Sequence, residues 1–120
     1  MLEFGPENHV YIDEYEKTLE KLIVDTKPNV KGIILMTPFY LELNEEDLMR
    51  RTMDRYGDIV RRLASTNKCV FVDTQSAFNE VLKDLYPATL AWDRVHPTTT
   101  GHMILAREIL HITGFNWERI

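Results

Sequence analysis

The sequence predicts an α/β layered fold with two parallel strands and about four helices, in a single domain over residues 1–120. Helical segments alternate along the chain with two short, continuous apolar runs. Such runs are typical of strands that are covered on both faces, as in a parallel sheet. A helix between the two runs makes the strands parallel and joins them by a right-handed crossover.

The first helix is predicted over about residues 10–26, because apolar side chains recur there at helical spacing. They are Tyr11, Tyr15, Leu19, Leu22 and Ile23. Pro28 and Asn29 then turn the chain. The apolar run from Gly32 to Thr37 is the first predicted strand, and Pro38 ends it.

A long second helix is predicted from about residue 44 to residue 65. Asn44 is a favourable N-cap residue, and three acidic residues follow it in the first turn, where the helix dipole favours anions. The predicted buried face of this helix consists of Tyr56, Ile59, Val60 and Leu63.

The second strand is predicted from about Cys69 to Val72, and Asp73 or Thr74 can cap the short helix that follows. The apolar stripe of this short helix is Phe78, Val81, Leu82 and Leu85. A loop from Tyr86 to Pro97 leads to a last helix that begins near Thr99 and stops at Gly114. The last helix is predicted to pack through Met103, Ala106, Ile109 and Leu110, and Phe115 and Trp117 follow in a tail that can fold back on the core.

The composition argues against several classes of function. A formal net charge of −5 makes a nucleic-acid partner unexpected, because phosphate binding needs clustered basic residues. No apolar run is long enough to span a bilayer, so no membrane span is predicted. The first residues show no signal-peptide pattern, and a cytoplasmic location is expected if Met1 is the natural start.

The cysteine and the histidines predict neither a disulfide nor a metal site. The single cysteine, Cys69, excludes an internal disulfide and is interpreted as a small buried side chain. The four histidines, His9, His96, His102 and His111, lack the spacing of zinc ligands. We therefore expect no metal and no cofactor.

The most informative motif is the run Asp93-Arg94-Val95-His96-Pro97, in the loop before the last helix. It places a carboxylate and an imidazole three residues apart, and Pro97 biases His96 away from helical backbone angles. In a hydrolytic triad a neutral imidazole takes the proton of a serine, and an anion holds the imidazole in the right tautomer. Taken alone, the tetrapeptide favours a plainer interpretation, in which Asp93 caps a turn and His96 is a surface or half-buried histidine.

The surrounding residues favour the catalytic interpretation. The pattern D-x-x-H-P, followed by Gly101-His102 and then by Leu105-Ala106, resembles the last conserved block of the SGNH (GDSL-type) serine hydrolases. Residues 30–38 look like a late core strand of that family with its exit loop, and residues 69–74 look like the strand and turn before the last block. The likeness runs from about Tyr11 to about Ile112 and covers only the second half of a full-length member.

The resemblance implies a three-layer, flavodoxin-like fold of which this chain is the C-terminal portion. It also implies that His96 is the general base and Asp93 its orienting partner. In the family the nucleophilic serine lies in an upstream G-D-S motif, and a glycine and an asparagine from two middle blocks help its amide bind the oxyanion. None of these three blocks can be placed in this sequence.

No serine in the chain has the setting of a nucleophile. Gly57-Asp58 is followed by isoleucine inside a helical pattern, and Ser65 and Ser76 are better explained as helix-terminus residues. The leading hypothesis is therefore the C-terminal portion of an ester or lipid acyl hydrolase that is inactive alone. The alternatives are a non-catalytic, oligomerising α/β module and a self-sufficient hydrolase that uses Ser65 or Ser76.

Active residues of layered α/β folds lie beyond the carboxyl ends of the strands. Residues 37–40, 73–74 and 93–96 are therefore expected to converge there. Phe39 and Tyr40 can line an acyl pocket, although packing roles fit them somewhat better. His102 is expected to be a helix-start or packing residue, and a supporting role towards His96 stays open.

A sheet of two strands leaves an edge unpaired where the family has a strand from the missing half. Exposed edges associate readily. We therefore expect the segment from Gly32 to Thr37 to pair with the same segment of a second copy, giving a symmetric homodimer with a continuous sheet. A missing N-terminal half is the other expected partner, and the complete enzyme would bind an ester substrate.

Overall fold

The computed structural model describes residues 9–115. In this part of the chain the helices and strands follow the predicted order, with two short helical segments added. They are α1 (Ile12–Thr26), the 3-10 helix η2 (Lys27–Asn29), β1 (Ile34–Met36), α2 (Leu48–Asn67), β2 (Val70–Val72), α3 (Thr74–Leu82), α4 (Pro87–Leu90) and α5 (Thr99–Ile112). The α/β class and the two parallel strands are confirmed.

The sheet consists of β1 and β2 within the described residues. The strands pair in parallel, with Ile34 opposite Val70. A hydrogen bond of 3.1 Å from the Thr37 amide to the Val72 carbonyl extends the ladder by one step. Both strands are short, so the paired part of β1 covers only the centre of the predicted run from Gly32 to Thr37.

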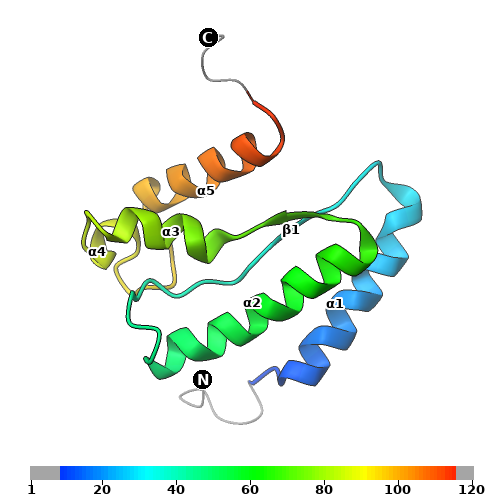
Figure 1. Cartoon of the computed structure of the whole chain (residues 1–120), viewed down its shortest axis with the longest axis horizontal. Helices are drawn as coiled ribbons and strands as arrows, with labels where there is room; N and C mark the ends of the chain where they lie inside the picture. The colour runs from blue at the N-terminus through cyan, green and yellow to red at the C-terminus, as the bar shows by residue number, and fades with distance from the viewer. Residues whose placement is uncertain (1–8, 116–120) are drawn as a thin grey trace.

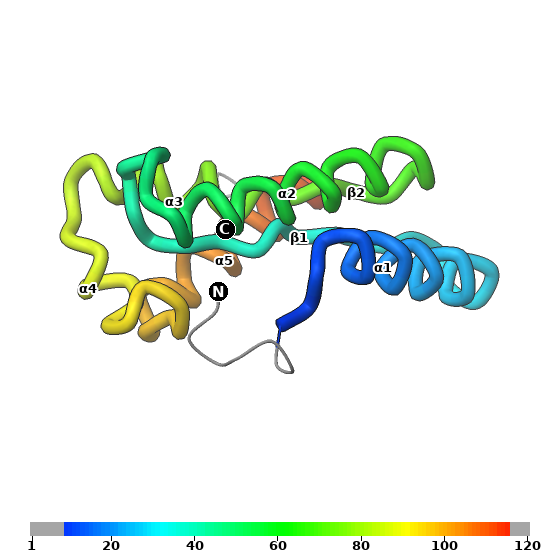
Figure 2. Tube along the Cα trace, turned by 90° about the horizontal axis from the view of Figure 1, so that it is seen from below, coloured from blue at the N-terminus to red at the C-terminus, as the bar shows by residue number. Residues whose placement is uncertain are grey.

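The elements form three layers. Figure 1 shows the two strands between α1 and α2 on one side and α5 on the other. In Figures 1 and 2, α4 lies at the end of the molecule away from α1. One apolar cluster joins α1, β1 and α2 and contains Ile23, Leu35, Ile59, Val60, Leu63 and Ala64. A second cluster lies around α3 and α4 and contains Leu41, Phe78, Leu82, Leu90 and Ala91.

The long helix α2 begins later than predicted. Its N-cap is Asp47, whose carboxylate accepts a hydrogen bond of 3.0 Å from the Arg50 amide. Asn44 instead accepts a hydrogen bond from the Glu46 amide and forms the turn before the helix. Both residue types are good caps, so local preference does not distinguish them. The predicted buried face of α2 is confirmed.

The last helix, α5, packs through a different face from the one predicted. Ile104 and Leu105 pack against the second cluster, whereas Met103 is 65% exposed and Ala106 is also exposed. Both sets of residues have helical spacing, so periodicity alone fits either face. The close approach of Gly101 to α4 places this end of α5 against the second cluster.

The described residues contain no helix that is long and apolar enough to cross a membrane. The predicted tail is described only in part. Phe115 is exposed at the end of the described residues, and Trp117 lies outside them.

Candidate active site

The segment between α4 and α5 forms a tight turn around Asp93. Oδ1 of Asp93 accepts hydrogen bonds from the amides of Val95, at 2.9 Å, and His96, at 2.7 Å. Its other oxygen, Oδ2, contacts Nδ1 of the His96 imidazole. The aspartate therefore holds both the backbone and the side chain of His96, and acid and base come together within four residues.

The turn depends on an unusual backbone conformation at Arg94. The φ angle of this residue is 67°, in the left-handed region that residues other than glycine rarely adopt. The Arg94 amide donates a hydrogen bond of 3.1 Å to the Ala91 carbonyl. An antiparallel bridge between Ala91 and Pro97 closes the base of the turn.

The Asp93 carboxyl is held in its ionised form. The hydrogen bond from the His96 amide is the largest cause that lowers the pKa of Asp93, followed by the contact with the imidazole and by the bond from the Val95 amide. Together they keep this pKa well below its usual range. An anion therefore faces Nδ1 of His96 at every pH near neutral.

The imidazole of His96 stands open to solvent. Its side chain is 85% exposed, and it borders a surface hollow of about 530 Å³ that is lined by Trp92, Asp93, His96, Pro97, Thr98 and Thr99. Within the described part of the chain, the imidazole ring contacts Asp93 through Nδ1. The second ring nitrogen, Nε2, is therefore available to accept a proton from a group that enters this hollow.

The start of α5 lies against the end of α4, through Thr98 and Gly101. The Thr98 side chain caps α5 by accepting a hydrogen bond from the Gly101 amide, and it donates a bond of 2.8 Å to the Thr89 carbonyl. A methyl group on Gly101 would lie 2.3 Å from the Leu90 carbonyl oxygen and 2.9 Å from Cβ of Pro97. The glycine is required here because the two backbones approach so closely.

The residues after β1 that were considered for an acyl pocket have other partners. The rings of Phe39 and Phe78 lie 4.7 Å apart, and Phe39 packs on the second cluster. The Tyr40 backbone is bonded in both directions by the Gln75 side chain, at 2.8 and 3.0 Å. Neither Phe39 nor Tyr40 lines the hollow beside His96.

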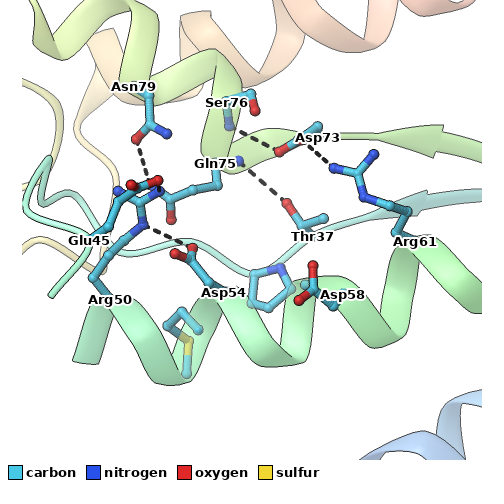
Figure 3. Close-up of a pocket in the computed structure, with 13 residues that line it drawn as sticks. Thr37, Glu45, Arg50, Asp54, Asp58, Arg61, Asp73, Gln75, Ser76 and Asn79 are labelled. Atoms are coloured by element: carbon cyan, nitrogen blue, oxygen red, sulfur yellow. Dashed lines mark hydrogen bonds and ion pairs between the residues drawn. The ribbon is translucent and has the colours of Figure 1, made fainter. Parts of the chain in front are cut away.

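The two serines lie away from this hollow. Ser76, in the first turn of α3, borders a polar cleft of about 360 Å³ between α2 and α3 (Figure 3), which shares no lining residue with the hollow beside His96. Its amide is capped by Asp73. Ser65 is exposed on α2. Gly57 lies inside the same helix, next to the Thr37 side chain.

Sequence reasoning overlooked Trp92. This side chain lies directly before Asp93, is 87% exposed and borders the hollow. An aromatic residue next to the motif was the available signal. His102 is an exposed residue of the first turn of α5. In residues 9–115 no group of three or more histidine, cysteine, aspartate or glutamate side chains could hold a metal ion.

The fold is that of an α/β protein in which a carboxylate, Asp93, contacts an exposed imidazole, His96, beside a surface hollow. The family model described as GDSL-like Lipase/Acylhydrolase matches residues 3–109. The chain belongs to this family, and the resemblance seen in its sequence is confirmed.

Three relatives show how far the similarity extends. A curated acetylxylan esterase of Geobacillus stearothermophilus is 65% identical over 118 residues, covering 98% of this chain and 54% of the esterase. A crystal structure of an acetylxylan esterase from the same organism gives a TM-score of 0.92 at 66% identity, over 97% of this chain and 53% of that chain. LAE5, an alpha/beta hydrolase enzyme from the metagenome of Lake Arreo in Spain, gives a TM-score of 0.89 at 49% identity, over 92% of this chain and 50% of that one.

This chain spans about half the length of the relatives it matches. The solved structures of the Geobacillus esterase include catalytic mutants in which a serine, an aspartate or a histidine is replaced by alanine.

Proposed function

We propose that this chain carries the acid–base half of the active site of a GDSL-type ester hydrolase, with His96 as general base and Asp93 as its orienting partner. The observation that carries the proposal is the contact between the Asp93 carboxylate and Nδ1 of a solvent-exposed imidazole. The catalytic mutants of the Geobacillus esterase supply support. Two of them replace an aspartate and a histidine three positions apart, which is the spacing of Asp93 and His96.

In the proposed reaction a hydroxyl nucleophile attacks the acyl carbon of the ester while Nε2 of His96 takes its proton. The tetrahedral intermediate then expels the alcohol, and the imidazolium returns the proton to it. Water repeats the two steps on the acyl-enzyme and releases the carboxylic acid. Asp93 stays ionised, because its hydrogen bonds hold its pKa below the usual range, and its charge stabilises the imidazolium.

The nucleophile in this reaction comes from outside the chain. The sequence contains no G-D-S motif, and a base with its orienting partner gives little rate enhancement without a nucleophile and oxyanion donors. We therefore expect the chain to be inactive alone. Because two of the three matched relatives are named acetylxylan esterases, we propose acetyl esters of carbohydrates as the substrate class of the complete enzyme.

The free edge of β1 is the proposed contact surface for the part that completes the sheet. β1 pairs with β2 on one edge. Ile34 and Val70, on the sheet face opposite Leu35, remain 42% and 41% exposed. Unpaired edges and exposed apolar faces favour association. The chain alone is proposed to dimerise through the segment from Gly32 to Thr37, and an upstream esterase half would compete for the same edge.

The alternative function is a non-catalytic, oligomerising α/β module. The exposed edge of β1 favours it too, because association through that edge does not need the acid–base pair. The two functions differ in whether His96 contributes to hydrolysis once the missing part is supplied.

A complementation experiment separates them. The upstream half of a GDSL-type esterase is expressed separately and mixed with this chain, and hydrolysis of p-nitrophenyl acetate is followed. We expect hydrolysis to be restored and His96→Ala to lower it by roughly 10³-fold or more. His111→Ala, which changes an exposed histidine at the other end of α5, is the matched control and should leave the rate unchanged.

The outcomes are distinct. A mixture that associates without hydrolysis, or that hydrolyses equally well with His96→Ala, would favour the non-catalytic module. Covalent labelling of the folded chain alone by a fluorophosphonate probe, read as a mass increase, would show an activated serine within these residues. That result would contradict the expected inactivity of the chain alone.

A further inference from the structure

We propose, resting on the function above, that Glu42 and Arg94 are positioning residues that keep the proton of His96 on Nδ1. They would do so by holding the turn that brings Asp93 to the imidazole. The contacts between this turn and the loop after β1 carry the proposal.

The acid–base turn is formed by residues 93–96. Within it, Arg94 contacts three consecutive residues, 40–42, of the loop after β1. The Leu41 amide donates a hydrogen bond of 3.1 Å to the Arg94 carbonyl. Nη1 of Arg94 lies 3.4 Å from Oε1 of Glu42. A hydrogen bond to the Tyr40 side chain raises the pKa of Arg94, and the charge of Glu42 adds to this effect. Both the backbone and the guanidinium of Arg94 therefore contact the loop.

The loop is itself anchored on its other side by buried polar groups. Nη1 of Arg50 donates a hydrogen bond of 2.7 Å to the Glu42 carbonyl, and Nε of Arg50 bonds Asp54 at 2.9 Å. The Arg50 side chain is only 5% exposed. Gln75 clamps the backbone of Tyr40 in both directions. Figure 3 shows Arg50, from α2, and Gln75, from α3, extending towards each other across the cleft. Glu42 therefore links a rigid anchor to the turn.

The turn needs such support because its own contacts are local and exposed. Arg94 adopts a φ of 67°, which is unfavourable for a residue with a side chain. Asp93 and His96 are both exposed, so water competes for their hydrogen-bonding groups. Without the contacts between Arg94 and the loop after β1, the turn would open more often, and the carboxylate would spend less time at Nδ1 of His96.

The tautomer of His96 is the property that this support controls. A general base that acts through Nε2 must carry its proton on Nδ1, and a partner that accepts the Nδ1–H bond selects this form. An imidazole that loses its carboxylate partner also populates the Nε2–H form, which cannot take a proton at that nitrogen. Loosening the turn therefore lowers the fraction of competent base, even where the fold is intact.

The test is ¹⁵N nuclear magnetic resonance of the histidine side chains in the whole chain, at a pH where His96 is neutral. The His96 signals are assigned with His96→Gln. We expect the Nδ1–H form to dominate in the wild type, and Glu42→Gln and Arg94→Gln each to shift the tautomer ratio at least twofold towards Nε2–H. Glutamine at position 94 keeps a side chain, so the backbone preference at that position changes little, and exposed ion pairs contribute little to stability. Both variants should therefore unfold near the wild-type temperature.

Two further variants make the result decisive. Glu46→Gln changes an exposed acid of the same loop and should leave the ratio unchanged. Asp93→Ala should abolish the Nδ1–H preference, and an unchanged ratio in that variant would contradict the proposed acid–base pair itself. A shift with Asp93→Ala but none with Glu42→Gln or Arg94→Gln would overturn the positioning role alone. Additive shifts in the double variant would overturn the proposed action of Glu42 and Arg94 as a pair.

Discussion

Adding a single methyl group at Gly101 should destabilise the protein strongly, in contrast to the usual effect of alanine in a helix. A Cβ at this position would lie 2.3 Å from the Leu90 carbonyl oxygen and 2.9 Å from Cβ of Pro97. The carbonyl cannot move freely, because it accepts a hydrogen bond of 2.8 Å from the Thr98 amide and another from the Thr98 hydroxyl. Leu90 is also fully buried.

The magnitude follows from two opposing effects. Gly→Ala inside a helix normally stabilises by about 0.5–1 kcal/mol. Overpacking typically costs about 1–3 kcal/mol, and shifting the Leu90 carbonyl weakens hydrogen bonds that contribute about 1 kcal/mol each. We expect a net loss of about 2–3 kcal/mol for Gly101→Ala. For a chain of 120 residues this lowers the unfolding temperature by about 8–12 °C.

Gly57→Ala is the matched control for this experiment. Its Cβ would lie 3.6 Å from the Thr37 side chain, which is an ordinary contact, so it should stabilise the protein by about 0.5–1 kcal/mol. Thermal and urea unfolding followed by circular dichroism measure both variants against the wild type. Equal stabilisation by both alanines would refute the close approach of α5 to the Leu90 carbonyl.

Three further predictions concern the core, the acid–base turn and the sheet edge. Leu41→Ala removes a fully buried side chain and should cost about 2–5 kcal/mol in urea unfolding, whereas Leu43→Ala, at an exposed position of the same loop, should cost almost nothing. Because the folded-state pKa of Asp93 is lowered, the stability it contributes is fully present above its unfolded pKa of about 3.9. This contribution is lost as the pH falls through the folded pKa, so the difference in unfolding temperature between wild type and Asp93→Asn should shrink as the pH falls below about 4. Light scattering at micromolar concentration should give twice the chain mass of 14.1 kDa, and a monomeric wild type would contradict the proposed dimer. The Thr37 amide faces β2, so the amide of the neighbouring Met36 faces the free edge. Met36→Pro removes that amide and should give the monomer.

The elements with strong local signals could be predicted from the sequence. The apolar runs around β1 and β2 and the buried face of α2 are continuous or periodic over many residues, and the structure has them where they were expected. The start of α2 could not be fixed, because Asn44 and Asp47 are equally suitable caps. The buried face of α5 could not be chosen either, since Met103 and Ile104 both begin a stripe with helical spacing.

Residues that support the candidate site through distant contacts could not be predicted. Gln75 meets the Tyr40 backbone from thirty-five positions away, and nothing in its own neighbourhood in the sequence indicates such a clamp. The same holds for Arg50, which an amphipathic pattern would place among the exposed charges of α2, yet its guanidinium is buried. Asp93 and His96 were recognisable because a motif of few residues contains their contact.

The sequence separation between contacting residues also explains which parts of an active site can be retained by a chain that spans half the length of its relatives. Asp93 and His96 meet within one turn, so little loop-closure entropy opposes their contact. The loop that contacts Arg94 lies far upstream of it in the sequence, but both partners are inside these residues. The nucleophile and the oxyanion donors that we propose for the complete enzyme would come from other strands. We therefore expect the isolated chain to contain a preorganised base, so that docking the missing part at the β1 edge restores chemistry without rebuilding the turn around Asp93.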